Sequence, residues 1–200
     1  MTQIIPKPYW YLRHGETDWN ARGLAQGRTD IPLNETGIEQ ALRAGRTLAA
    51  LFQNNERPFN RIVSSPLSRA LVTATYVRNE IGRLAGVSLP LQVEEGLSEV
   101  CFGIHEGTSM GDWYHDWIAA GTPLESGESF ASLTQRAIAT INHSLAFEGT
   151  PLFVAHGALF RGLRAGMNLT VNERLENAVP LRITLGPKGW SIMTNKLPLE

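Results

Sequence analysis

Short hydrophobic runs alternate along the chain with longer segments whose hydrophobic positions recur every three or four residues. The short runs predict buried strands, and the longer period predicts helices that pack one face against a sheet. The predicted strands span residues 9–12, 61–65, 91–97, 152–155, 179–185 and 190–194. The predicted helices span residues 36–52, 66–84, 109–119, 129–147 and 158–167. This alternation favours a three-layer α/β/α sandwich around a mostly parallel mixed sheet of about six strands.

Two helix starts are marked by their local sequence. Thr36 and Glu39 have the spacing of a capping box, which predicts that the first long helix begins at Thr36. Ser65 followed by Pro66 predicts the N-cap and first position of the second helix. Residues 18–35 are rich in Gly, Asn, Asp and Pro, which predicts a loop before the first of these helices.

The composition is that of one globular domain, which we expect to span residues 1–200. With 42% hydrophobic and 18% charged residues, a chain of 200 residues can bury most of its apolar surface. A net charge of −1 gives no overall field that would attract nucleic acid or an anionic membrane, so we expect neither partner. The oligomeric state is left open, with a homodimer as one option.

Several features favour a cytoplasmic location. No hydrophobic run approaches the roughly 20 residues that span a bilayer, and residues 1–8 lack the hydrophobic core of a signal peptide. The single cysteine, Cys101, cannot form an internal disulfide, which fits a reducing compartment. His105 and His115 lie near acids, but their spacing fits no common zinc pattern, so we expect no metal site.

The stretch Arg13-His14-Gly15 directly follows the first predicted strand. The carboxyl ends of strands are where open α/β sheets place their ligands. Arginine offers a planar fork of donors that suits phosphate, and a neutral imidazole can act as a nucleophile. On this stretch alone, a strand-end histidine that is held by a hydrogen bond and does no chemistry is an equal alternative.

Three further strand ends have a similar design. Arg69 falls in the first turn of the second helix, where backbone N–H groups already favour an anion. Glu99 follows the third strand, and His156-Gly157 follows the fourth. Because the carboxyl ends of parallel strands lie along one edge of a sheet, these side chains should converge on a phosphate pocket with a nucleophile and a proton donor.

The ordered set of motifs resembles the histidine phosphatase superfamily, which includes cofactor-dependent phosphoglycerate mutase and the fructose-2,6-bisphosphatase domain. In style the chain is closest to the short phosphatases such as α-ribazole phosphatase. The motifs that carry the resemblance are Arg13 to Thr17, Trp19-Asn20, Gln26-Gly27, Ser64 to Ala70, Glu99 with Gly103, Gly127 to Ser129, and His156-Gly157. The resemblance implies a phosphoglycerate mutase-like fold and a phosphoryl-transfer activity.

The resemblance also implies roles for these residues. His14 would attack phosphorus through Nε2 and carry a transient phosphoryl group, while a backbone carbonyl, expected to be that of Gly15, fixes its Nδ1–H. Arg13, Arg69 and His156 would hold the equatorial phosphate oxygens.

Other positions would bind substrate or move protons. Glu99 would protonate the leaving oxygen and then activate the water that hydrolyses the phosphohistidine. Asn20 would add a neutral donor, or else simply cap a turn, and Gln26, Gly27 and Gly157 would line the substrate site. No metal or cofactor is implied, because cationic side chains supply the positive charge. Arg161 is interpreted as a structural ion-pair partner.

The segment from residue 84 to 135 departs most from the family. It contains eight acidic residues and no lysine or arginine, so its charge is −8 and that of the remainder is +7. It lacks the basic insertion with which the mutases grip the second charged end of phosphoglycerate, and Ala158 replaces a polar contact that mutases often carry. We therefore expect hydrolysis of a small phosphorylated metabolite. A mutase-type transferase and a non-catalytic phospho-ligand binder remain alternatives.

Residues 98–128 are expected to form a lid-like insertion over the active site. Trp113, Tyr114 and Trp117, with His105, would pack a neutral, aromatic or cationic leaving group, for which α-ribazole phosphate is one example. The alternative is that Trp113 and Trp117 only bury the short helix of this segment. An acidic lid would repel a bisphosphorylated or carboxylated substrate.

Overall fold

The central strands present alternate residues to two separate hydrophobic clusters. In strand β1 (Tyr9–Arg13), Tyr9 and Tyr11 pack into one cluster, and Trp10 and Leu12 pack into the other. The same two-sided burial occurs in β4 (Pro151–Ala155), all of whose residues are buried. A strand that is hydrophobic on both faces requires a covering layer on each side of the sheet.

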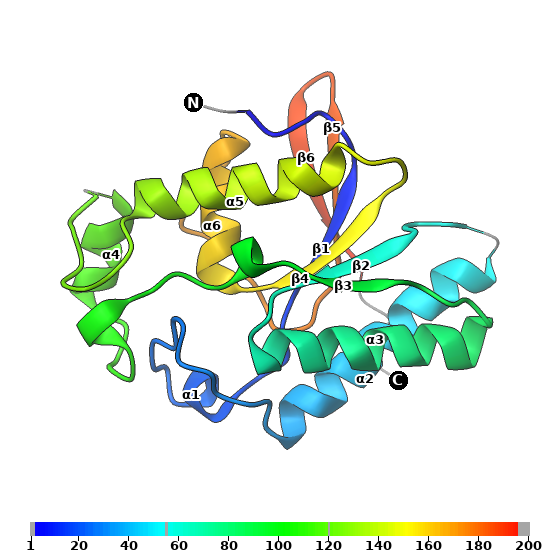
Figure 1. Cartoon of the computed structure of the whole chain (residues 1–200), viewed down its shortest axis with the longest axis horizontal. Coiled ribbons are helices and arrows are strands. Elements are labelled where there is room, and N and C mark those ends of the chain that lie inside the picture. Colours follow the sequence, from blue (N-terminus) through cyan, green and yellow to red (C-terminus); the bar gives the residue numbers. More distant parts are fainter. Residues whose placement is uncertain (1–2, 55, 120, 196–200) are drawn as a thin grey trace.

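The computed structural model describes residues 3–54, 56–119 and 121–195, and Figure 1 shows this layered arrangement. The other strands of the described residues are β2 (Arg61–Ser64), β3 (Leu91–Val93), β5 (Leu181–Gly186) and β6 (Gly189–Thr194). They form one sheet in the order β3-β2-β4-β1-β5-β6. The four strands from β3 to β1 are parallel, and β5 and β6 are antiparallel. The predicted mixed sheet of about six strands is therefore confirmed.

Two helix pairs form the outer layers. Helices α2 (Glu35–Gln53) and α3 (Ser68–Ala85) cover one face of the sheet. Helices α5 (Phe130–Leu145) and α6 (Gly157–Gly166) cover the other, which gives the expected three-layer sandwich. Within the part of the chain that the structure describes, no helix is long and hydrophobic enough to cross a membrane.

Both predicted helix starts are wrong in detail. Helix α2 begins at Glu35, because the side chain of Asn34 accepts a hydrogen bond from the Gly37 N–H at 2.8 Å. Helix α3 begins at Ser68, and its cap comes from the first loop, where Asp30 Oδ1 accepts from the backbone N–H and hydroxyl of Ser68 at 2.8 Å each. The Ser65 side chain is used elsewhere, as described below.

Three other boundaries also differ from expectation. The predicted loop 18–35 begins with a one-turn helix, α1 (Asp18–Ala21), capped by the Thr17 hydroxyl. Strand β3 ends at Val93, and residues 95–97 form a 3₁₀ turn, η1 (Glu95–Leu97), before Glu99. In the proposed lid, a second 3₁₀ turn, η2 (Gly103–His105), precedes helix α4 (Asp112–Ala119), which starts three residues later than predicted.

The turn after β1 is held against the start of α2 by two glycines. A Cβ atom on Gly15 would lie 2.3 Å from the Gly37 carbonyl oxygen, and one on Gly37 would lie 2.1 Å from the Glu16 carbonyl oxygen. The glycine after His14 is therefore needed for close packing of two backbone segments. This contact fixes the loop that carries His14.

Candidate active site

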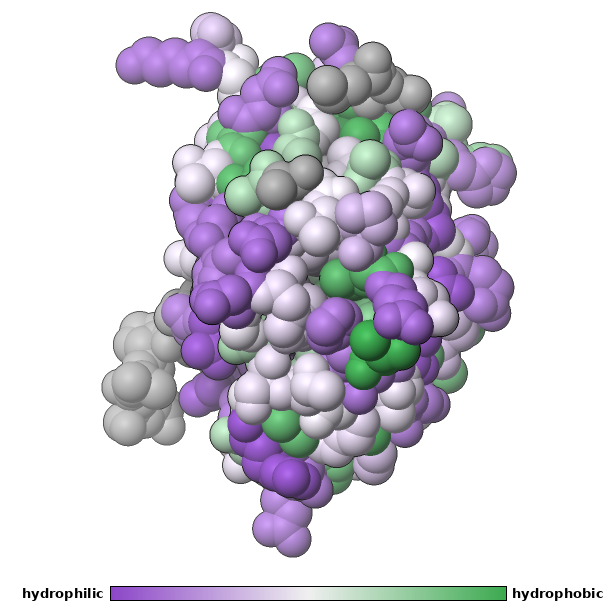
Figure 2. All heavy atoms as spheres, turned by 90° about the vertical axis from the view of Figure 1, so that its left-hand side faces the viewer, coloured by the Kyte–Doolittle hydropathy of each residue, from purple (hydrophilic) through white to green (hydrophobic). Residues whose placement is uncertain are grey.

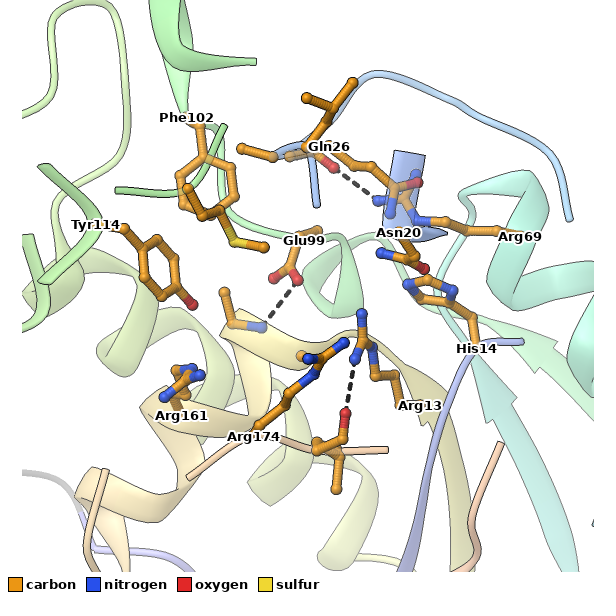
Figure 3. A pocket seen from close by; sticks show the side chains of 17 residues that line it. Arg13, His14, Asn20, Gln26, Arg69, Glu99, Phe102, Tyr114, Arg161 and Arg174 are labelled. Carbon is orange, nitrogen blue, oxygen red and sulfur yellow. Dashed lines mark hydrogen bonds between the residues drawn. The ribbon is translucent and has the colours of Figure 1, made fainter. Parts of the chain in front are cut away.

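The residues predicted from strand ends converge at the carboxyl edge of the parallel strands. Arg13 ends β1, and the His14 N–H continues the ladder by donating to the Ala155 carbonyl at 3.0 Å. Arg69 lies in the first turn of α3, and His156 is the N-cap of α6. A pocket at this edge is lined by Arg13, His14, Asn20, Gln26, Gly27, Arg69, Glu99 and Gly157 (Figure 3). The ring of His156 lies behind it, with its centroid 5.2 Å from that of His14.

His14 is held in one tautomer. Its Nδ1 lies 2.6 Å from the carbonyl oxygen of Gly15, the expected partner. A carbonyl can only accept, so Nδ1 carries the proton and Nε2 keeps its lone pair. Burial, followed by the charges of Arg13 and Arg69, lowers the pKa of His14 well below its usual value. The imidazole is therefore neutral at physiological pH, which is the form that a nucleophile requires.

The guanidinium groups of Arg13 and Arg69 are fixed by backbone carbonyls. Arg13 donates to the Leu175 carbonyl at 2.6 Å, and Arg69 donates to those of Thr29 and Gly27 at 2.9 and 2.7 Å. Burial lowers the pKa of Arg13 to about 10 and also lowers that of Arg69, and both stay charged at neutral pH. Carbonyls orient the two cations without neutralising them, which leaves their charge for an anion.

His156 is positioned by two hydroxyl groups. The Tyr11 hydroxyl donates to its carbonyl at 2.8 Å and accepts from its N–H at 3.1 Å. Its Nε2 lies 2.7 Å from Ser65 Oγ, which itself accepts from the Leu67 N–H at 3.3 Å, so Ser65 can donate to Nε2. His156 Nδ1, buried and with no partner in the protein, then carries the proton. Tyr11 and Ser65 were not identified from the sequence.

Glu99 lies at the N-terminus of α6. Its Oε1 accepts from the Val100 and Leu159 N–H groups at 3.0 and 2.8 Å, and its Oε2 accepts from the Ala158 N–H at 2.9 Å. The three backbone donors hold this buried side chain in one orientation. Oε2 accepts one of these three bonds and Oε1 accepts two, so Oε2 is the better placed oxygen to carry a proton toward the pocket.

Two neutral amides line the pocket from the first loop. Asn20 Oδ1 accepts from Asn177 Nδ2 at 3.3 Å, and Gln26 Oε1 accepts from the Thr17 hydroxyl at 2.9 Å. With their oxygens engaged, both amides can present N–H groups to a ligand. The alternative in which Asn20 caps a turn is not observed, because Thr17 caps that helix.

The rim of the pocket holds two arginines that were not assigned to the site from the sequence. Arg161 and Arg174 both line it (Figure 3). Among the described residues Arg161 does not form the expected ion pair, and the hydrogen bonds from its Nη1 go to Val171 O at 3.2 Å and Asn172 Oδ1 at 2.7 Å. It could have been found, because it lies one helical turn after Gly157 and so faces the same way. Arg174 lies in an irregular segment without any periodic signal.

The segment 98–128, called the cover from here on, differs from the expected acidic and aromatic lid. Of the eight acids between residues 84 and 135, Glu99 is the one that lines the pocket within the described residues. Trp117 is fully buried and Trp113 stacks on His105 with ring centroids 4.3 Å apart, so Tyr114 is the one member of the aromatic set in the lining. On the side that carries α1 and α4, hydrophobic residues form small patches among hydrophilic ones (Figure 2). The alternative in which the tryptophans bury their own helix therefore describes this segment better.

Arg136 on α5 joins the two ends of this cover. It donates to the carbonyls of Gly96 and Ser98 at 2.9 and 2.8 Å, directly before Glu99. It also forms a bidentate pair with Glu128, at 2.9 and 2.7 Å, where the cover ends. In the part of the chain that the structure describes, no three His, Cys, Asp or Glu side chains cluster closely enough to hold a metal ion.

Together, an α/β sandwich and a buried histidine between arginines at its carboxyl edge define a phosphate-binding protein with a candidate nucleophile. The chain belongs to the histidine phosphatase superfamily (branch 1), whose family model matches residues 9–194. An uncharacterized phosphatase of Bacillus subtilis is 31% identical over 90% of each chain. An adenosylcobalamin/α-ribazole phosphatase of Salmonella typhimurium is 35% identical over 74% of this chain and 72% of the relative.

A solved structure of a mycobacterial glucosyl-3-phosphoglycerate phosphatase is similar in fold, with a TM-score of 0.75 and 26% identity over 96% of this chain and 100% of that chain. Another relative, agropine synthesis reductase of Rhizobium rhizogenes, is 31% identical, but this chain spans 42% of its length. The matching proteins include phosphatases and phosphoglycerate mutases, and the two phosphatase relatives and the solved phosphatase structure support the phosphatase interpretation.

Proposed function

We propose that this chain hydrolyses phosphomonoesters of small metabolites without a metal ion, through a phosphohistidine on His14. The observation that carries the proposal is the 2.6 Å contact between His14 Nδ1 and the Gly15 carbonyl, in a pocket flanked by Arg13 and Arg69. It directs the lone pair of Nε2 toward the position where two fixed cations would hold a phosphoryl group.

In the first step, His14 Nε2 forms a bond to phosphorus while the bond to the ester oxygen breaks. Arg13, Arg69 and His156 Nδ1–H stabilise the equatorial oxygens, and the Asn20 amide donates to the same group. Glu99 gives a proton from Oε2 to the leaving oxygen, so the alcohol departs neutral.

In the second step, Glu99 is a carboxylate and takes a proton from a water molecule. The water oxygen bonds to phosphorus, the bond to Nε2 breaks, and inorganic phosphate leaves. Glu99 is then protonated again, as at the start of the cycle. The positive charge that a metal ion supplies in other phosphatases comes here from the arginines.

Labelling tests this proposal. The protein is incubated with a ³²P-labelled monoester for milliseconds to seconds, without added metal and with a chelator, and the reaction is stopped in alkaline detergent. We expect an acid-labile, base-stable adduct, and in His14→Ala we expect no adduct and a kcat lower by at least about 10³-fold. His143→Ala, which removes an exposed histidine on α5, is the matched control and should form the adduct and keep the kcat of the unsubstituted protein.

The alternatives predict different outcomes. A mutase-type transferase would pass the label to an added phosphoglycerate acceptor faster than to water. A non-catalytic binder would bind phosphate esters but form no adduct with any of them. Full activity of His14→Ala would refute the proposed nucleophile.

A further inference from the structure

Arg161 and Arg174 have no role in the mechanism proposed above. In the view of Figure 3, His14 and Arg161 lie on opposite sides of the pocket and Arg174 lies between them. Both arginines are therefore on the side where the leaving group must sit when the phosphoryl group is held at His14. They reach the pocket from α6 and from the irregular segment that follows it.

Arg161 is fixed without being neutralised. Its hydrogen-bond acceptors, Val171 O and Asn172 Oδ1, are both uncharged. Its guanidinium carbon also lies 5.5 Å from the centroid of the Tyr114 ring, a cation–π contact. An aromatic leaving group that stacked on this face of Tyr114 would have to displace Arg161. Tyr114, one of the two aromatic residues of the cover among the described lining residues, is thus already used to position a cation.

Arg174 adds a second charge to the same side. It is exposed, and it is close enough to Arg13 for its charge to lower the pKa of Arg13. Cations that converge in this way repel one another unless an anion lies between them. The arrangement is unfavourable in the free protein and becomes favourable when a suitable ligand binds.

The charge count of the pocket shows how much negative charge it can accept. Among the described lining residues there are four arginines and one acid, Glu99, which is protonated at the start of the proposed cycle, so the formal charge is +4. A phosphomonoester carries roughly −2 at neutral pH, which leaves about +2. Glu106 and Glu128 lie outside this lining, because Glu106 binds the N–H groups of Arg28, Thr29 and Phe102, and Glu128 pairs with Arg136. The charge of Glu106 still acts on Arg69, where it opposes the effect of burial and raises the pKa of that arginine.

We propose that the leaving group of the substrate carries an anionic group of its own, which Arg161 and Arg174 bind. A carboxylate suits this site, because its two oxygens can accept parallel hydrogen bonds from a guanidinium. This proposal rests on the hydrolase function above and narrows its substrate class to phosphate esters of hydroxy acids or of related anions. It replaces the expectation of a neutral, aromatic or cationic leaving group.

Matched ester pairs that differ only at the second group test the proposal. 3-Phosphoglycerate and glycerol 3-phosphate differ in a carboxylate against a hydroxymethyl group, and phosphoserine and phosphoethanolamine differ in a carboxylate against hydrogen. We expect kcat/KM to be higher for the carboxylated member of each pair by roughly 10- to 100-fold, as for a charge-assisted hydrogen bond. Raising the ionic strength should reduce this ratio, because Arg174 is exposed.

Variants assign the preference to the two arginines. Arg174→Gln and Arg161→Gln should each lower the ratio within a pair by roughly tenfold, because each removes one charged donor. Arg174→Gln is the primary variant, since an exposed side chain can be replaced with little effect on folding. The matched control is Arg182→Gln, an exposed arginine on β5 outside the pocket, and it should leave the ratio unchanged.

The outcomes separate this inference from the proposed function. Equal kcat/KM within both pairs, or ratios that neither variant changes, would overturn the anion site while the hydrolase stands. If no ester is turned over, calorimetry measures the binding of the same esters to the unsubstituted protein and decides whether the anion site exists. Tighter binding of 3-phosphoglycerate than of glycerol 3-phosphate, lost in Arg174→Gln, would support the anion site alone, and equal binding would overturn both.

Discussion

The floor and the rim of the pocket are built in different ways. The floor, formed by Arg13, His14, Arg69 and His156, comes from strand ends and one helix start, and backbone atoms or buried hydroxyls fix its side chains. The rim, formed by Phe102, Tyr114, Arg161 and Arg174, comes from the cover, α6 and an irregular segment. The floor binds what all substrates of a phosphatase share, whereas the rim meets what distinguishes them.

Glu99 is held by backbone donors, as the floor residues are, but it lies in the segment that forms part of the rim. Its substitution therefore has the largest expected effect and tests whether it acts with the floor. Glu99→Gln should lower kcat for an alkyl phosphate by roughly 10²–10⁴-fold, because the leaving oxygen then departs without its proton. With p-nitrophenyl phosphate, whose leaving group needs no proton, the loss in a single-turnover phosphorylation assay should be much smaller. Equal losses for both esters would show that Glu99 acts only as a structural acceptor for the start of α6.

Gly37 tests how far the rigidity of the floor depends on the packing beneath it. Gly37→Ala places a Cβ 2.1 Å from the Glu16 carbonyl oxygen, so one backbone segment must move. We expect the free energy of unfolding to fall by about 1–3 kcal/mol, with a loss of kcat because the turn after His14 shifts. Urea denaturation and activity measure the two effects.

The control for this substitution is an exposed glycine within α3. Gly82→Ala meets nothing closer than 3.7 Å, and it should raise the free energy of unfolding by up to about 1 kcal/mol through helix propensity. If both variants changed stability alike, close backbone packing could not be the reason for glycine at residue 37.

The two floor histidines predict a dependence of stability on pH. Burial lowers the pKa of both His14 and His156, so below pH 6.5 the unfolded chain takes up protons that the folded chain does not. The stabilisation is complete above pH 6.5 and is lost as pH falls, by up to about 1.4 kcal/mol per pH unit for each histidine.

Denaturant unfolding at pH 7 and pH 5 measures this slope. His14→Gln should reduce the difference between the two pH values, whereas the exposed His143→Gln should not. A slope that is the same in all three proteins would mean that His14 is not held neutral in the folded state.

The smallest expected effect is that of Ser65, whose hydroxyl positions His156 within the floor. Ser65→Ala removes the hydroxyl that we expect to keep the proton of His156 on Nδ1, and one neutral hydrogen bond contributes about 1 kcal/mol. We predict a fall in kcat/KM of up to about tenfold, with a changed acid limb in its pH profile. Ser64→Ala, next to it and equally buried, should have a smaller effect, because Ser64 donates only to the Ser65 carbonyl.

The same division explains what could be predicted from the sequence. Arg13, His14 and His156 follow hydrophobic runs that local periodicity identifies as strands, and parallel strands bring their ends together. The start of α2 could not be fixed in this way, because Asn34 and Thr36 are both acceptable caps and the packing of Gly37 on Glu16 selects the earlier one. Long-range contacts of this kind leave no local pattern.

The rim was the least predictable part. Net charge along the chain suggested an acidic cover over the substrate, but Glu106 and Glu128 turn away to bind backbone N–H groups and Arg136. Arg174 comes to the pocket from a segment without periodicity, so its contribution depends entirely on the tertiary fold. The charge of this sequence segment therefore predicted the charge of the cover but not that of the pocket beneath it.

The Arg136 contacts have a consequence for how such a protein can change. One guanidinium holds the backbone before Glu99 and the carboxylate of Glu128, so the segment between them is a loop with both ends fixed. Doubling the length of such a loop costs only about 0.6 kcal/mol of closure entropy. We therefore expect residues 100–127, which follow Glu99, to be exchangeable, so that grafting a different segment there offers a route to new substrate preferences with the catalytic residues unchanged.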